Sequence, residues 1–108
     1  MTALYMNDKC SKLEDFHVTF NCVHPGIVRT DLYEHVRWIA YAAAIFMRSP
    51  KEGADTLIHA AVAPEIEGKG GLYLENSQIR TPSEFCRNFE NQVKMWQKSC
   101  ELCGVNPL

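Results

Sequence analysis

The sequence predicts an α/β protein with a parallel but incomplete β-sheet, and three observations support this prediction. Segments with helical spacing and segments with strand-like alternation follow one another in the order helix, strand, helix, helix, strand, helix. The strand-like segment 17–23 carries apolar residues on both faces, as a strand covered on both sides does. Only two strands are evident, and a sheet of two strands is too small to cover the apolar faces of four helices. We therefore expect residues 1–108 to form one partial domain, about half of a doubly wound sheet with helices on both faces.

The first half of the chain gives three elements. A helix is expected over Thr2–Leu13, and a strand over His17–Val23. Pro25 and Gly26 end the strand, because proline cannot donate to a ladder and glycine permits a sharp turn. A second helix is expected over Asp31–Met47, with an apolar surface broader than the usual stripe.

The second half begins with the clearest local signal. Ser49-Pro50-Lys51-Glu52 has serine at the cap, proline at the first helical position and glutamate at the third, which predicts a helix over 50–63. A glycine-rich turn precedes a short strand over Leu72–Leu74. Thr81-Pro82-Ser83-Glu84 repeats the capping pattern before a last apolar stripe from Phe85 to Cys103, and Gly104 is placed to cap that helix.

Composition narrows the class of protein. Hydrophobic residues make up 46% and charged residues 22%, with a net charge of −2 and no basic stripe, so a nucleic-acid partner is not expected. Five cysteines in an ordinary globular composition do not suggest a disulfide framework, and we expect an intracellular protein, cytoplasmic or peripheral to an endomembrane. The apolar run 38–47 is too short to span a bilayer, yet Arg37 and Arg48 flank it in a way compatible with a membrane surface or a buried helix.

Five motifs then occur in an order and spacing that cover nearly the whole chain. They are VTFNCVHPGIVRT (18–30), SPKEGA (49–54), AVAPEIEG (61–68), GGLY (70–73) and KMWQKSC (94–100). Together they resemble the C-terminal part of the short-chain dehydrogenases/reductases, and in particular the retinol-dehydrogenase-like branch. The resemblance implies a Rossmann-like fold and NAD or NADP as cofactor.

The same resemblance assigns candidate binding residues. It implies that Pro25 and Gly26 line a nicotinamide pocket, and that the Val28 backbone and the Thr30 hydroxyl bind the carboxamide or a nearby phosphate. The alternative is a plain strand-to-helix turn capped by the threonine. The resemblance also implies a lipophilic alcohol or carbonyl substrate, such as a retinoid, steroid or polyprenoid. The candidate substrate-binding residues lie in the apolar helix and are Trp38, Tyr41, Ile45 and Phe46. The alternative for these four residues is ordinary core packing.

No catalytic residue is expected in this chain. The family's glycine-rich phosphate loop and catalytic serine have no counterpart here. Tyr5 and Lys9 have the spacing of its catalytic Tyr-x-x-x-Lys pair, but the alignment places Tyr5 over an apolar position, and we interpret the pair as a solvated helix face. Cys100 and Cys103 fall in phase with an apolar stripe and are interpreted as core thiols, so no metal site is expected.

Two hypotheses of function follow. The first is a fragment of an NAD(P)-dependent oxidoreductase that is inactive alone. The second is a non-catalytic module, a truncated isoform or pseudoenzyme, that forms homo- or hetero-oligomers through its apolar helix faces.

Overall fold

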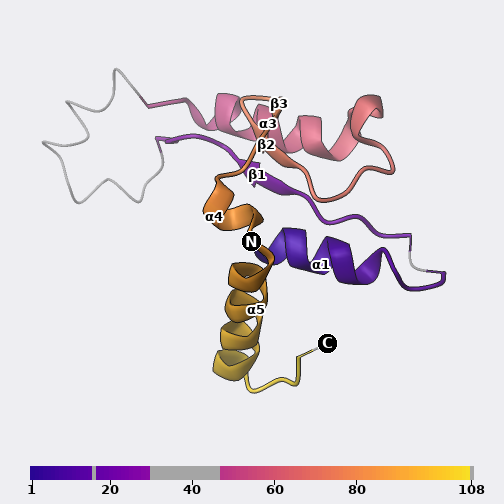
Figure 1. Cartoon of the computed structure of the whole chain (residues 1–108). Coiled ribbons are helices and arrows are strands. Elements are labelled where there is room, and N and C mark those ends of the chain that lie inside the picture. Colours follow the sequence, from indigo (N-terminus) through magenta and orange to yellow (C-terminus); the bar gives the residue numbers. More distant parts are fainter. Residues whose placement is uncertain (16, 30–46, 108) are drawn as a thin grey trace, which may run out of the picture. The chain divides into compact units, whose positions relative to one another are not determined.

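The computed structural model describes residues 1–15, 17–29 and 47–107, and its α/β class agrees with the prediction (Figure 1). Most of the predicted helix Asp31–Met47, together with Thr30 and the four candidate substrate residues, lies outside the described residues. The chain divides into two compact units: one comprises Met1–Cys22, Gly68–Tyr73 and Arg80–Leu108, and the other comprises Val23–Glu67 and Leu74–Ile79.

An open three-stranded sheet in the order β1-β2-β3 is formed by Cys22–His24, Tyr73–Glu75 and Gln78–Arg80. The Phe20 carbonyl accepts from the Gly71 amide, and the Cys22 amide donates to the Leu72 carbonyl. Because both partners advance together along the chain, the segments leading into β1 and β2 run parallel.

The strand β3 was not predicted from the sequence. Asn76 and Ser77, which join β2 to β3, have φ values of 56° and 54°. Two successive left-handed residues are typical of a tight hairpin turn, so β3 returns antiparallel to β2. The sheet is therefore partly parallel with one antiparallel edge strand, and it is open and incomplete as expected.

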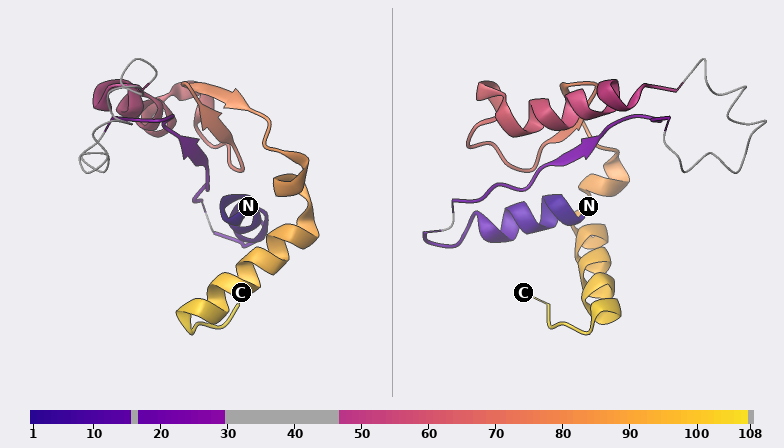
Figure 2. Two further views of the ribbon diagram at one scale, coloured as in Figure 1. Left: turned by 90° about the vertical axis from the view of Figure 1, so that its left-hand side faces the viewer. Right: turned by 180° about the vertical axis from the view of Figure 1, so that it is seen from behind.

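The first unit is held together by aromatic stacking between helices. In this unit α1 spans Thr2–Cys10, α4 Glu84–Arg87 and α5 Phe89–Cys103, and α1 crosses α5 (Figure 2). Tyr5 is 5% exposed and stacks on Trp96 at 5.5 Å and on Phe89 at 6.2 Å between ring centroids.

The last helix is not continuous. Ser83, and not Thr81, is the N-cap of α4, and its hydroxyl accepts from the Cys86 amide. Asn88 ends α4 in an extended conformation and caps α5 through its side chain. Gly104 closes α5 in the left-handed conformation, at φ 67°, as predicted.

The second unit is built on α3, Pro50–Val62, which matches the predicted helix to within one residue and is followed by the short helix η2, Pro64–Ile66. Ser49 and Glu52 form the full capping box. The Thr56 side chain is 1% exposed, and its hydroxyl oxygen accepts from the Ser77 amide at 3.3 Å. By contrast the apolar stripe of α3 is open, with Leu57, Ile58 and Val62 exposed by 52%, 57% and 71%.

Candidate functional site

The bend that follows β1 is tied to a segment twenty residues further on. Val28 and Arg48 form a parallel bridge, in which the Arg48 amide donates to the Ile27 carbonyl and the Arg29 amide donates to the Arg48 carbonyl, both at 2.9 Å. In a parallel bridge of this pattern, the flanking residues turn their peptide groups to the partner and the central residue turns its own away. The N–H and C=O of Val28 therefore point away from Arg48, and the described part of the chain offers neither of them a hydrogen-bond partner.

Gly26 is required at the bend for two local reasons. Its φ is +85°, in the left-handed region that favours glycine. A Cβ at this position would also lie only 2.9 Å from Cδ of Arg48, so the Arg48 side chain packs directly against the bend. The sharp turn expected at this glycine is therefore present, and the side chain that lies against it is that of Arg48.

His24 holds the bend from its strand side. Pro25 has no amide hydrogen, so Gly26 carries the first backbone donor after β1. His24 Nδ1 accepts a hydrogen bond from that Gly26 amide at 3.2 Å. The same nitrogen lies 3.7 Å from Oε1 of Glu75 on β2.

The side chain of Val28 rests on helix α3 at a position where only glycine fits. A Cβ at Gly53 would lie 2.5 Å from Cγ2 and 3.3 Å from Cγ1 of Val28. The start of α3 is fixed in turn by Ser49, whose amide and hydroxyl both donate to Glu52 Oε2 at 2.7 Å. These hydrogen bonds, from the hydroxyl first and then the amide, hold the pKa of the Glu52 carboxyl below its ordinary value.

A polar pocket of about 210 Å³ lies in the same unit. Arg48 lines it together with two carboxylates and a hydroxyl of α3 and with polar residues of the β2–β3 turn: Glu52, Asp55, Thr56, Asn76 and Ser77. The arginine therefore packs its stem against Gly26 and contributes to the wall of a polar pocket.

The described residues include only part of the predicted binding set. Pro25, Gly26 and Val28 lie together on the bend after β1, whereas Thr30 is outside the described residues. The predicted substrate residues are likewise outside them: Trp38, Tyr41, Ile45 and Phe46. The roles of all these residues remain predictions. His24 and Arg48 were not singled out for the bend; the only sequence signal was an imidazole directly before a residue without an amide hydrogen.

Tyr5 and Lys9 have a structural explanation. The Tyr5 ring is part of the aromatic core of the first unit, and Lys9 Nζ lies 5.5 Å from the centre of that ring. The interpretation of this pair as a solvated helix face is therefore wrong for the tyrosine. Of the two thiols assigned to the core, Cys100 is buried and Cys103 is exposed.

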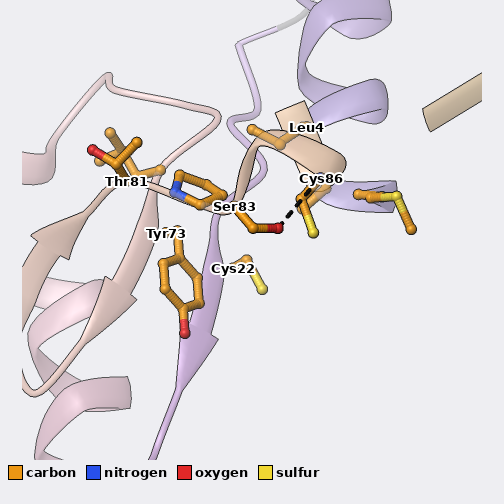
Figure 3. Close-up of a pocket in the computed structure, with 10 residues that line it drawn as sticks. Leu4, Cys22, Tyr73, Thr81, Ser83 and Cys86 are labelled. Atoms are coloured by element: carbon orange, nitrogen blue, oxygen red, sulfur yellow. Dashed lines mark hydrogen bonds between the residues drawn. The ribbon is translucent and has the colours of Figure 1, made fainter. Parts of the chain in front are cut away.

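A second pocket, of about 320 Å³, belongs to the first unit (Figure 3). Its wall combines apolar side chains with two thiols, from Cys22 and Cys86, and three hydroxyl groups, from Tyr73, Thr81 and Ser83. None of the predicted binding residues lines it. Over residues 1–15, 17–29 and 47–107 there is no cluster of three or more potential metal ligands. Over the same residues no helix is long and apolar enough to cross a membrane.

The glycine-bearing bend lies at the carboxyl end of a strand whose approach runs parallel to its neighbour, which is the edge where doubly wound α/β proteins bind their ligands. The homologues of this chain are dehydrogenases of the short-chain dehydrogenase/reductase family. Human polyprenol dehydrogenase is 44% identical over 97 residues, which cover 85% of this chain and 29% of that protein. Human retinol dehydrogenase 12 is 31% identical over 107 residues, covering 94% of this chain and 33% of that protein.

The zebrafish (Danio rerio) polyprenol dehydrogenase is 42% identical over 93 residues, covering 82% of this chain and 29% of that protein. The chain thus spans about a third of the length of the curated relatives it matches. No family profile and no solved structure matches it.

Proposed function

We propose that this chain is the C-terminal part of an NAD(P)-dependent short-chain dehydrogenase/reductase that acts on a lipophilic alcohol or carbonyl of the polyprenoid or retinoid kind. The similarity to polyprenol and retinol dehydrogenases supports the chemical class of the substrate. Within the family, segments 31–38 and 98–105 resemble the X-linked dehydrogenase/reductase member, which is the branch we favour. The setting would be intracellular, cytoplasmic or at an endomembrane surface.

The observation that carries the cofactor assignment is the pair of backbone groups on Val28. A nicotinamide carboxamide has one donor group and one acceptor oxygen, which match a C=O and an N–H on the same residue. The bridge to Arg48 uses neither group of Val28, and over residues 1–15, 17–29 and 47–107 no other group pairs with them, which supports their use for such a ligand. The residues present therefore fit the cofactor, which would supply the hydride acceptor or donor, while Pro25, Gly26 and Val28 would hold its ring.

The chain would supply one wall of the cleft and not the catalytic groups. A sheet of three strands with an open apolar helix face fits a part of a larger doubly wound domain. We therefore expect the isolated chain to have no dehydrogenase activity.

A hybrid enzyme tests this function. The matching 97 residues of human polyprenol dehydrogenase would be replaced by this chain, and oxidation of a polyprenol with NAD or NADP would be followed by cofactor absorbance. We expect the hybrid to turn over and the isolated chain to give no signal above background. A folded hybrid without activity would contradict the proposal, and turnover by the isolated chain would contradict its dependence on a second part.

Two variants of the hybrid locate the cofactor. Val28→Pro removes the N–H, whereas Val28→Ile keeps the backbone and serves as the matched control. We expect the cofactor Kd to rise about ten-fold in the proline variant, which corresponds to about 1.4 kcal/mol. Equal Kd values in two folded variants would show that this bend does not hold the nicotinamide.

The second hypothesis, a non-catalytic interaction module, is favoured by the open apolar positions of α3 and by Phe85, Phe89 and Leu102, which are exposed by 64%, 53% and 76%. Size-exclusion chromatography with light scattering on the chain distinguishes the two. A concentration-independent oligomer would favour the module, and a cooperative monomer would count against it.

A further inference from the structure

A single nitrogen atom of His24 faces two groups with opposite requirements. The Gly26 amide donates to Nδ1, so that nitrogen must carry a lone pair and the ring proton must reside on Nε2. The Glu75 carboxylate, at 3.7 Å from the same Nδ1, can form a close ion pair only when Nδ1 is protonated. Both contacts cannot be satisfied in one protonation state.

Each state has a different consequence for the bend. In the neutral state the imidazole holds Gly26, two residues along the chain, in an arrangement like the Asx turn that asparagine and aspartate form. In the protonated state Nδ1–H turns to Glu75, and the Gly26 amide loses its acceptor. The His24 and Glu75 side chains are 49% and 39% exposed, so the imidazole exchanges its proton with solvent directly.

Two charged side chains face this arrangement. Glu75, on the neighbouring strand, faces Nδ1 of His24, and Arg48 packs against Gly26. Since Arg48 also holds the bend through its bridge to Val28, release of Gly26 loosens one of the two attachments and leaves the other in place.

We propose that His24 is a positioning residue whose unprotonated Nδ1 holds the Pro25–Gly26 bend in the geometry that binds the nicotinamide cofactor, and whose protonation releases the bend to Glu75. The part that concerns the cofactor rests on the function proposed above. The holding of the bend does not, because it follows from the two contacts of Nδ1 alone.

The test is nuclear magnetic resonance on the uniformly ¹⁵N-labelled full chain between about pH 8 and about pH 5. We expect the imidazole nitrogens to show the Nε2–H tautomer at the high end. The Gly26 amide shift should move with the titration of His24, and hydrogen exchange at Gly26, corrected for the intrinsic pH dependence, should become about five-fold faster on protonation. A Gly26 signal that ignores the titration of His24 would overturn the proposal.

Four variants separate positioning from general stability. His24→Asn keeps an acceptor near Nδ1 but does not titrate, so Gly26 should stay protected at every pH. His24→Leu has no acceptor, so Gly26 should be unprotected throughout. Glu75→Gln removes the charged partner of a protonated Nδ1, so the acceleration of exchange at Gly26 at the low end of the pH range should be smaller. His59→Asn is the matched control, because His59 also faces a glutamate, Glu65, at 3.5 Å, but through Nε2 and remote in sequence from the bend.

The hybrid enzyme distinguishes the two levels of the claim, with the cofactor Kd measured by binding fluorescence. The leucine variant should raise the Kd several-fold at the high end of the pH range, and asparagine should restore it. If Gly26 follows the imidazole but neither His24→Leu nor Val28→Pro changes the Kd, the cofactor assignment of the bend is wrong and the switch stands. If Val28→Pro weakens cofactor binding and His24→Leu does not, the assignment stands and the positioning role of His24 is wrong.

Discussion

The close packing of Gly53 against Val28 predicts how much a substitution at Gly53 changes the free energy of unfolding. Gly53, in the first turns of α3, is buried against the side chain of Val28, and a Cβ there would lie 2.5 Å from Cγ2. Ordinary carbon contacts are about 3.5–4.0 Å, so Gly53→Ala must displace Val28 by roughly 1 Å. Because valine is restricted at χ1, its side chain cannot rotate away from the new methyl group, and the backbone of the bend must move instead.

Two opposing free-energy terms set the net effect. Overpacking of this kind costs about 1–3 kcal/mol. Replacement of glycine by alanine inside a helix recovers about 1 kcal/mol of helix propensity. We therefore expect Gly53→Ala to lower the free energy of unfolding by about 0–2 kcal/mol, although the same change at an open helical site would raise it.

A double-mutant cycle isolates the contact. Val28→Ala removes both methyl groups that the new Cβ would meet, so the double variant should be more stable than the sum of the single changes by about 1 kcal/mol. Urea unfolding followed by circular dichroism measures all four corners of the cycle. Gly104→Ala is the control for backbone strain alone, since its φ is +67° and no atom lies within 4 Å of the added Cβ. An additive cycle, or a Gly53→Ala variant more stable than the wild type, would refute the reasoning.

Three further outcomes are expected. The pKa of the Glu52 carboxyl is lowered in the folded chain, so its contribution to stability is present above the ordinary value of 4.5 and is lost as pH falls through the lowered pKa. Circular dichroism should show this loss of helix in acid. The variant Ser49→Ala should make the loss smaller. Tyr5→Ala should cost about 3 kcal/mol because it empties an aromatic stack, while Tyr5→Phe should leave both the melting temperature and the turnover of the hybrid nearly unchanged; loss of turnover in that variant would show a catalytic role. The rates of maleimide labelling, measured by mass spectrometry, should follow exposure, with Cys22 and Cys103 fast, Cys86 slower, and Cys10 and Cys100 slowest. Equal labelling rates would contradict the burial pattern.

Local signals in the sequence predicted local structure well. The capping box at Ser49 and the left-handed cap at Gly104 depend only on residues within one helical turn, and both occur as expected. The second capping pattern shows where such reasoning stops. Two serine or threonine residues, Thr81 and Ser83, were available within three positions, and the residue pattern did not distinguish them or indicate the break at Asn88, after which α4 packs against α5.

Strand limits were predicted less well because a strand ends where its partner ends. The segment His17–Val23 alternates as a strand should, yet the ladder that defines β1 covers Cys22–His24. Its approach is bonded partly through a side chain, since the Asn21 carboxamide oxygen accepts from the Leu72 amide in place of a backbone carbonyl. For β3 a signal did exist in Asn76, a residue that tolerates the left-handed conformation of a tight hairpin.

Two histidines of this chain show why the candidate site could not be fully derived from residue types. His24 and His59 each lie within 4 Å of one glutamate, so the two pairs consist of the same residue types. At His59 the nitrogen that faces Glu65 is Nε2, and among the described residues no backbone amide shares it, so protonation there only strengthens an ion pair. At His24 the nitrogen that faces Glu75 also accepts from Gly26, so protonation exchanges one partner for the other. A proton becomes coupled to the shape of the backbone only when one atom serves both contacts, and that coincidence is set by the fold and not by the sequence pattern.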